Sequence, residues 1–233
     1  MHLVRVWILF GIFASVGSLA ATRASHAHDL LLGNSLEEVV AQSAKVARIR
    51  ITKRVPLQTP EMTEPCGYMY SARVVESFKG GTDPFEFVAH ADQDFVGFDH
   101  DYLVMALHNF DMTPEVDVFL RHMLSPEEEE RVRCRTAATN YYVPGAHRML
   151  WVIQELSGEE WLAPDTRPLV AWCRTEGNEG EMPGGRQVKL GSYVYDAIQW
   201  QPARNLITRA VTARPYLSDG TVDPKFRPGL CPD

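Results

Sequence analysis

Histidine and aspartate side chains are concentrated in the stretch HADQDFVGFDHDY, and both types can bind metal ions. An EF-hand loop needs an oxygen ligand at its fifth position and a bidentate glutamate at its twelfth. Counted from Asp92, those positions hold Val96 and Leu103, so the motif fails. We therefore predict no metal ligand here and interpret the acids as a polar turn between two strands. The residues concerned are His90, Asp92, Asp94, Asp99, His100 and Asp101.

Covalent catalysis requires a nucleophile with a base in reach. The chain contains neither G-x-S-x-G nor H-E-x-x-H, the motifs that would indicate a serine hydrolase or a zinc protease. We therefore predict no catalytic residue and no cofactor. The competing hypothesis is a hydrolase-type enzyme with a cleft in the C-terminal part, lined by Trp161, Asp165 and Arg174.

The four cysteines, Cys66, Cys134, Cys173 and Cys231, are the remaining reactive side chains. An even number of cysteines in an exported chain favours disulfides, and four cysteines allow three pairings. We favour Cys66 with Cys134 and Cys173 with Cys231, because each half of the chain would then carry its own crosslink. The alternative, four thiols or a zinc site, has no C-x-x-C spacing to support it.

Residues 1–27 have the order of a secretory signal, with Arg5 first, an apolar run from Val6 to Val16, and then small residues. Cleavage after Ala20 or after Ala27 fits the small residues equally well. The apolar run is shorter than the roughly 20 residues of a membrane-spanning helix, which argues against a retained anchor. We expect a secreted or periplasmic protein with no membrane span after signal removal.

The charge balance argues against nucleic acid as a partner. The whole chain has 23 basic and 30 acidic residues, and removal of the signal takes two arginines, which leaves a formal charge of about −9. A basic strand face could still dock a nucleic acid, as barrels of this kind often do. We favour a solvated face balanced by nearby acids, made of Arg48, Arg50, Lys53 and Arg54.

The elements that position these side chains begin with a helix at NSLEEVVAQSAK, where Ser35 and Glu38 form a capping box. Four strands follow, each with alternating or continuous apolar residues: VARIRITKRV, YMYSARVV, PFEFVAHA and DYLVMALH. Short links join them, and Gly80 and Gly81 form one turn. This pattern predicts an antiparallel sheet that closes into a barrel.

The rest of the chain is expected to complete the barrel and extend it. Two helices, TPEVDVFLRHML and SPEEEERVRCRTAA, form a helical insertion over residues 113–138, with Glu127–Glu130 on a solvated face. HRMLWVIQEL is expected to be the fifth barrel strand and GSYVYDAIQW a last helix. The predicted organisation is a signal peptide (1–27), an OB-like barrel with its insertion (28–156) and a loop-rich extension packed on the barrel (157–233).

The segment from Val39 to Leu107 resembles the netrin-like module, which is shared with tissue inhibitors of metalloproteinases. The resemblance lies in the entry VVAQSAKVARIRI, the strand YSARVVESFKGG, the strand FEFVAHAD and the strand VGFDHDYLVMAL. It implies a mainly β protein with a five-stranded OB-type barrel, crosslinked by disulfides and used to bind another protein. The module also occurs in bacterial exported proteins of unknown role, which this chain is similar to.

The chain departs from the inhibitor pattern at the residue that inhibition requires. In those inhibitors an N-terminal cysteine binds the catalytic zinc of the protease, whereas the termini expected here are Ala21 or His28. The sequence therefore predicts an exported, non-catalytic binding module whose partner is an unidentified protein. The contacting loops are expected to be residues 56–65 or the insertion after residue 110. An envelope structural protein is the remaining alternative.

Overall fold

The computed structural model describes residues 35–89, 97–109, 121–122, 124–143, 149–163, 174–175, 178–179, 186–190 and 193–229, with the backbone alone described between 174 and 196. The expected signal peptide, Cys173 and Cys231 lie outside these residues. The elements, in chain order, are α2 (Leu36–Gln42), β1 (Lys45–Leu57), β2 (Gly67–Lys79), β3 (Phe85–Ala89), β4 (Asp101–His108), α4 (Pro126–Thr136), β5 (Tyr141–Val143), β6 (Leu150–Leu156), β7 (Glu159–Ala163), β8 (Arg174–Thr175), β9 (Asn178–Glu179), β10 (Arg186–Leu190), β11 (Tyr193–Gln199) and α6 (Trp200–Thr212).

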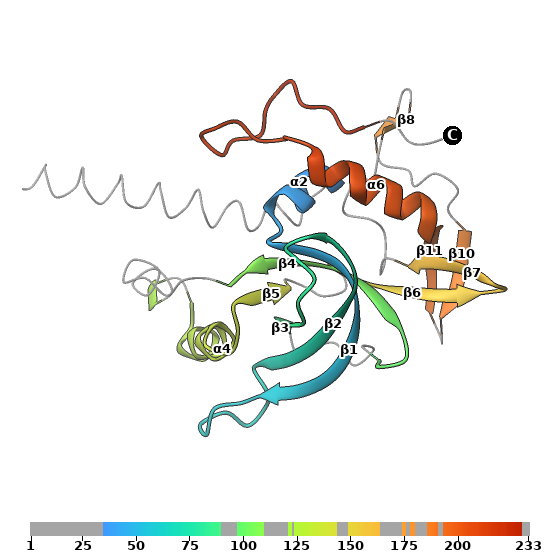
Figure 1. The fold of residues 1–233 in the computed structure, drawn as a ribbon. Helices are drawn as coiled ribbons and strands as arrows, with labels where there is room; N and C mark the ends of the chain where they lie inside the picture. The colour runs from blue at the N-terminus through green and yellow to red at the C-terminus, as the bar shows by residue number, and fades with distance from the viewer. Residues whose placement is uncertain are drawn as a thin grey trace, which may run out of the picture.

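The structure is mainly β and contains a closed five-stranded barrel, as expected (Figure 1). Its strands follow the order β1-β2-β3-β5-β4, and β4 pairs with β1 to complete the ring. The long β1 and β2 strands make the largest part of the wall, with three register shifts between them. Such irregularities bend a strand, which a small barrel requires.

One pair in the barrel is parallel, although the sequence predicted an antiparallel sheet throughout. β3 and β5 run in the same direction, and Val88 pairs with Tyr142. The reason is geometric: strand directions cannot alternate all the way round a closed ring of five. At least one neighbouring pair must therefore be parallel, and the short β5 provides it.

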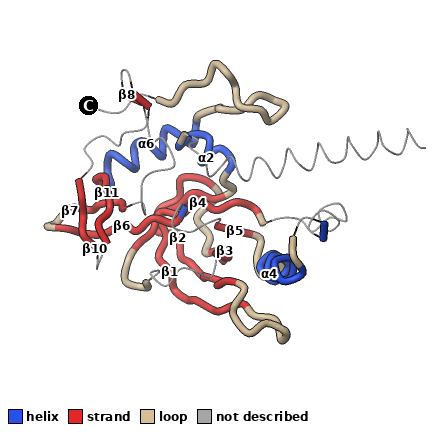
Figure 2. The backbone as a smooth tube through the Cα atoms, turned by 180° about the vertical axis from the view of Figure 1, so that it is seen from behind, coloured by secondary structure: helices blue, strands red, loops and turns tan. Residues whose placement is uncertain are grey.

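The prediction that HRMLWVIQEL is the fifth barrel strand is wrong. The fifth barrel strand is β5, which pairs with the end of β4 at Leu107 and His108. β6 pairs farther along the same edge of β4, with its residues opposite Asp101–Val104. It leads the sheet away from the barrel into a wing formed by β6, β7, β11 and β10. Figure 2 shows this wing on the side of the barrel opposite α4.

The expected last helix at GSYVYDAIQW is a strand over most of its length. β11 covers Tyr193–Gln199 and pairs with β10 and β7, and α6 starts only at Trp200. Tyrosine, valine and isoleucine favour strands because their side chains pack well on a pleated surface. α6 then packs on α2 and shares a hydrophobic core with the barrel. Its buried residues are Trp200, Ala203, Leu206, Ile207 and Ala210.

The barrel core follows the alternation seen in the sequence. Ala47, Ile49 and Ile51 are buried from β1, as are Phe85 and Phe87 from β3. The predicted start of α2 is confirmed: Ser35 is its N-cap, and the Ser35 hydroxyl accepts a hydrogen bond from the backbone N–H of Glu38 at 3.3 Å. The Glu38 carboxylate accepts from the Ser35 hydroxyl at 3.2 Å, so only one half of the capping box forms as predicted.

The turn predicted after β2 is also present, with a φ of 86° at Gly80 and 82° at Gly81. A Cβ atom at Gly80 would lie 2.6 Å from the carbonyl oxygen of Ala44, so glycine is required at this position. Among the helices that the structure describes, none is both long and apolar enough to cross a bilayer.

Candidate functional site

Helix α4 is the described part of the helical insertion, and its own sequence specifies it well. The Ser125 hydroxyl accepts a hydrogen bond from the backbone N–H of Glu128 at 3.3 Å, and the Glu128 carboxylate accepts one from the backbone N–H of Ser125 at 3.0 Å. The Ser125 hydroxyl also donates a hydrogen bond to the Glu128 carboxylate at 2.8 Å, and this bond, followed by the one from the Ser125 backbone N–H, lowers the pKa of Glu128. Ion pairs one turn apart follow, Arg131 with Glu127 and Arg133 with Glu129. The first predicted helix of the insertion lies mostly outside the described residues.

A disulfide connects α4 to the barrel. Cys66, directly before β2, is bonded to Cys134 in α4, and their Cα atoms are 6.4 Å apart. The bond joins residues that are 68 positions apart in the chain. The first predicted pairing is confirmed, and the second, Cys173 with Cys231, involves residues outside the described part of the chain.

Two polar side chains support the C-terminal half of α4. The Arg135 guanidinium donates a hydrogen bond to the carbonyl oxygen of Cys66 at 3.3 Å. Burial lowers the pKa of Arg135, and the electrostatic interaction with Tyr142 partly offsets this decrease. The Asn109 side-chain amide donates to the carbonyl oxygens of Arg135, Thr136 and Thr139 at 3.3, 3.1 and 2.7 Å. Asn109 thus satisfies carbonyl groups that a helix end leaves without a partner in the helix.

The loop between β1 and β2, residues 58–66, lies against α4. The Thr59 hydroxyl donates a hydrogen bond to the Glu130 carboxylate at 2.7 Å, and Arg131 lies 3.9 Å from Glu64. Figures 1 and 2 show the loop and α4 on the same side of the barrel. We call residues 58–66 and 126–136 the loop–helix surface.

The loop–helix surface joins two segments that the sequence offered as separate contact regions. The β1–β2 loop and the insertion after residue 110 are brought together by the disulfide and by hydrogen bonds from Thr59 and Arg135, while Asn109 supports the end of α4. Sequence reasoning missed Thr59, Asn109 and Arg135. No local pattern marks them, because each acts on a residue far away in the chain.

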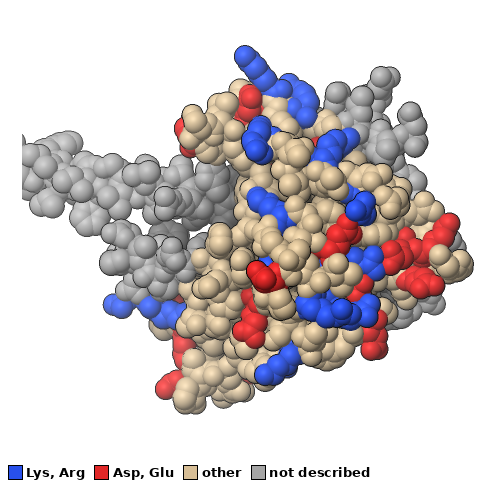
Figure 3. All heavy atoms as spheres, viewed as in Figure 1, with Lys and Arg blue, Asp and Glu red and all other residues tan. Residues whose placement is uncertain are grey.

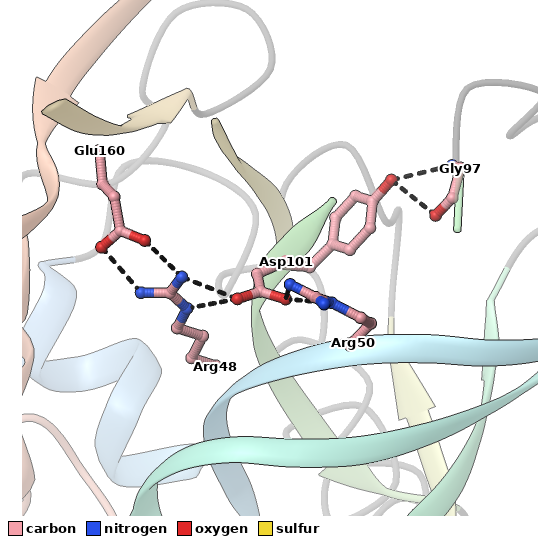
Figure 4. Close-up of polar contacts among 6 residues, drawn as sticks. Arg48, Arg50, Gly97, Asp101 and Glu160 are labelled. Carbon is pink, nitrogen blue, oxygen red and sulfur yellow. Dashed lines mark hydrogen bonds and ion pairs between the residues drawn. The ribbon is translucent and has the colours of Figure 1, made fainter. Parts of the chain in front are cut away.

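The basic face of β1 is paired with acids rather than open. The Asp101 carboxylate, 4% exposed, accepts hydrogen bonds from Arg48 Nε at 2.8 Å and from Arg50 Nε at 2.7 Å (Figure 4). The Arg48 guanidinium also donates a bidentate pair of hydrogen bonds to the Glu160 carboxylate from β7. Burial lowers the pKa of Arg48, but the bonds to Glu160 and Asp101 outweigh burial and raise it. The predicted balance of this face by nearby acids is confirmed for Arg48 and Arg50.

The remaining basic residues and the nearby aromatic rings do not form a stacking platform. The guanidinium carbon of Arg54 lies 3.7 Å from the centre of the Tyr68 ring and covers it. Tyr70 and Trp151 are buried in the core. Lys53 is exposed and makes no ion pair with the described residues. The rings therefore pack in or against the hydrophobic core of the barrel.

In the described part of the histidine- and aspartate-rich stretch, the histidine and aspartate side chains do not gather at one place. Asp99 is exposed and His100 half-buried in a turn, whereas Asp101 faces the arginines of β1. His90, Asp92 and Asp94 lie outside the described residues. Within the residues that are described, no group of histidine, cysteine, aspartate or glutamate side chains could hold a metal ion.

Of the cleft residues of the competing enzyme hypothesis, only Trp161 has a described side chain. Trp161 is 5% exposed and packs with Ala163 and Ala197 in a small core of the wing. Asp165 lies outside the described residues, and Arg174 is placed by its backbone in β8.

Charges of both signs cover the face of the molecule shown in Figure 3. Acidic side chains gather at the end formed by β6 and β7, and basic side chains spread over α6 and the β1–β2 face. The exposed acids of the β6–β7 hairpin are Glu155, Glu159 and Glu160. Comparison of the chain with family models, curated proteins and solved structures gives no match.

Proposed function

We propose that this protein is an exported, non-catalytic module that binds another protein through its loop–helix surface. The observation that carries the proposal is the joining of the β1–β2 loop to α4 by the Cys66–Cys134 bond and the Thr59–Glu130 hydrogen bond. Loops fixed on a rigid barrel are the usual carriers of binding functions. Holding a loop in place before association lowers the entropy cost of binding.

Four further features support export and a binding role. The apolar N-terminal run has the order of a secretory signal, and disulfides persist in oxidising compartments outside the cytosol. The netrin-like resemblance of residues 39–107 implies a barrel that binds proteins. In five-stranded barrels of this type, the loop between the first two strands and the loop between the last two border bound oligonucleotides and oligosaccharides, so these loops are an established position for a binding surface. These are the loops that form the loop–helix surface.

Affinity capture from the native exported fraction tests the proposal. The bait is the full mature chain, compared with a variant carrying Glu61→Lys and Glu64→Lys in the β1–β2 loop. The matched control carries Glu155→Lys and Glu159→Lys in the β6–β7 hairpin, which changes the charge by the same amount far from the surface. All four glutamates are exposed, so each variant should keep the melting temperature of the wild-type chain.

We expect a protein captured by the wild-type chain and by the hairpin variant to be lost with the loop variant. Crosslinks from that protein should map to residues 58–66 or 126–136. Equal capture by all three chains, or crosslinks confined to the wing, would reject the loop–helix surface as the binding site.

A further inference from the structure

Helix α4 is attached to the molecule without a buried apolar face. None of its 11 residues is buried. A helix of this length is marginal by itself in water, and most helices in proteins are stabilised by the packing of an apolar stripe. α4 lacks that stripe, because its sequence PEEEERVRCRT contains only Val132 and Cys134 as apolar residues. Its position must therefore depend on its other contacts.

Among the described residues, the hydrogen bonds and ion pairs of α4 with the rest of the molecule are few, and the disulfide is added to them. Half-buried Arg131 and exposed Glu64 form an ion pair at 3.9 Å, and such pairs at the surface contribute little in water. The Thr59–Glu130, Arg135–Cys66 and Asn109 hydrogen bonds each require α4 to be in place already. The chain itself ties the end of α4 at Thr136 to the start of β5 at Tyr141, whereas the Cys66–Cys134 bond is the covalent link between α4 and the β1–β2 loop. It holds the helix at a high effective concentration beside that loop.

The barrel does not depend on this bond in the same way. Neither cysteine belongs to the main hydrophobic core, which joins the barrel strands with α2 and α6. The ring is closed by backbone pairing, including β4 with β1 and β3 with β5. Breaking the bond would therefore leave the core contacts of the barrel unchanged.

We propose that the Cys66–Cys134 bond is a redox-operated clasp for the loop–helix surface. When it is oxidised, α4 docks against the β1–β2 loop; when it is reduced, α4 leaves while the barrel stays folded. The inference rests on the proposed function for its biological meaning, since the surface that opens and closes is the one proposed to bind a partner.

The reductant is a dithiol. Its thiolate attacks the sulfur of Cys134, because Cys134 is half-buried whereas Cys66 is 1% exposed. The Sγ–Sγ bond breaks, and Cys66 leaves as a thiolate and takes up a proton. The second thiol of the reductant then releases Cys134, so two electrons and two protons pass to the protein and the dithiol becomes a disulfide.

Hydrogen exchange measured by mass spectrometry tests the clasp without a partner. The oxidised chain is compared with the same chain after dithiothreitol, and with a variant carrying Cys66→Ser and Cys134→Ser. This variant keeps Cys173 and Cys231, so it separates the clasp from any effect of dithiothreitol on those two residues. The amides of α6 and β1 in the same molecule serve as the internal control.

We expect the amides of residues 130–136 to exchange about tenfold faster or more in the reduced chain and in the variant, with α6 and β1 unchanged. Unchanged protection of α4 would overturn the clasp, and so would loss of protection in β1 or failure of the variant to fold. Capture by the oxidised chain is a separate measurement: if it fails while α4 still responds, the proposed function fails and the clasp stands.

Discussion

Helices α4 and α6 have similar lengths, yet they are held in opposite ways. α6 has no side-chain hydrogen bond at its N-cap, and it is fixed by five residues buried in the same core as the barrel. α4 has a complete capping box and two ion pairs along its surface, but none of its residues is fully buried. The helix with the stronger capping and ion-pair pattern in its own sequence is therefore the one that is packed less tightly against the rest of the molecule.

This difference shows that helix formation and helix attachment depend on different residues. Capping and ion pairs act within one or two turns, so they define where α4 begins without fixing where it lies. The stripe Trp200, Ala203, Leu206 and Ile207 repeats every three to four residues and places α6 against α2 and the sheet. We therefore expect α6 to unfold with the barrel and α4 to move independently of it.

Truncating an apolar residue in each helix should give the largest contrast. Leu206→Ala removes a side chain that is 2% exposed, and it should lower the free energy of unfolding by about 2–5 kcal/mol. Val132→Ala in α4 removes a half-buried side chain outside the core, and it should change that free energy by less than about 0.5 kcal/mol. Denaturant unfolding measures both values. Similar losses for the two variants would contradict the comparison.

Alkaline pH should disrupt the barrel and α6 together. Burial raises the pKa of Tyr102 to about 12, so the folded chain favours the neutral phenol. Its contribution is complete below pH 10 and is lost as the pH rises from 10 to 12, by about 2–3 kcal/mol at most. Unfolding followed by circular dichroism between pH 9 and 12 measures this loss. The Tyr102→Phe variant should lack it, and an equally steep loss in that variant would assign the effect to another group.

The ion network beside α6 should have a smaller effect, confined to the α6 side. Arg48 lies over the ring of Trp200, 5.4 Å from its centre, so Asp101→Asn disturbs a residue that supports the start of α6. We expect a loss of about 1–2 kcal/mol for Asp101→Asn. For Glu160→Gln we expect less than about 1 kcal/mol, because the Glu160 side chain is 42% exposed.

Thermal unfolding and hydrogen exchange distinguish these outcomes. Faster exchange in α6 with unchanged α4 would fit the comparison. A larger loss for Glu160→Gln than for Asp101→Asn would show that Glu160, not Asp101, anchors Arg48.

Removing the two N-caps should give the smallest but most selective effect. Ser125→Ala deletes the capping hydroxyl of α4 and should cost about 1 kcal/mol of local helix stability. Because α4 lies outside the core, the melting temperature should stay the same while the amides of α4 exchange faster. Gln199→Ala at the N-cap of α6 is the matched control and should change neither, since Gln199 makes no side-chain capping bond. A lower melting temperature for Ser125→Ala would show that α4 is part of the cooperative fold.

Much of the barrel could be predicted from the sequence, because the side chains on the inward face of each strand pack in the core and are therefore apolar. The alternation of Ala47, Ile49 and Ile51 identified β1, and the continuous apolar run DYLVMALH identified β4, which is buried along most of its length. The three-residue β5 could not be predicted, since three residues are too few to show alternation. Its pairing with β3 arises only when the ring closes.

The candidate site was predicted less completely than the fold. Both of its segments and the Cys66–Cys134 bond were expected, but not that these segments meet. The hydrogen bond between Thr59 and Glu130 spans 71 positions, and no sequence spacing reports such a contact. The pairing of Arg48 with Glu160 spans 112 positions and likewise depends on where β7 is placed.

The sequence by itself determined the features that depend on neighbouring residues: the helix N-caps at Ser35 and Ser125, the glycine turn after β2, and the inward positions of the barrel strands. Tertiary structure alone decided which strand closes the barrel, where α6 begins, and that α4 meets the β1–β2 loop. The physical reason is the distance along the chain over which each kind of interaction acts. Caps and turns are formed by hydrogen bonds within a few residues, whereas strand order and helix docking follow from burying apolar surface and pairing charges that only the folded chain brings together.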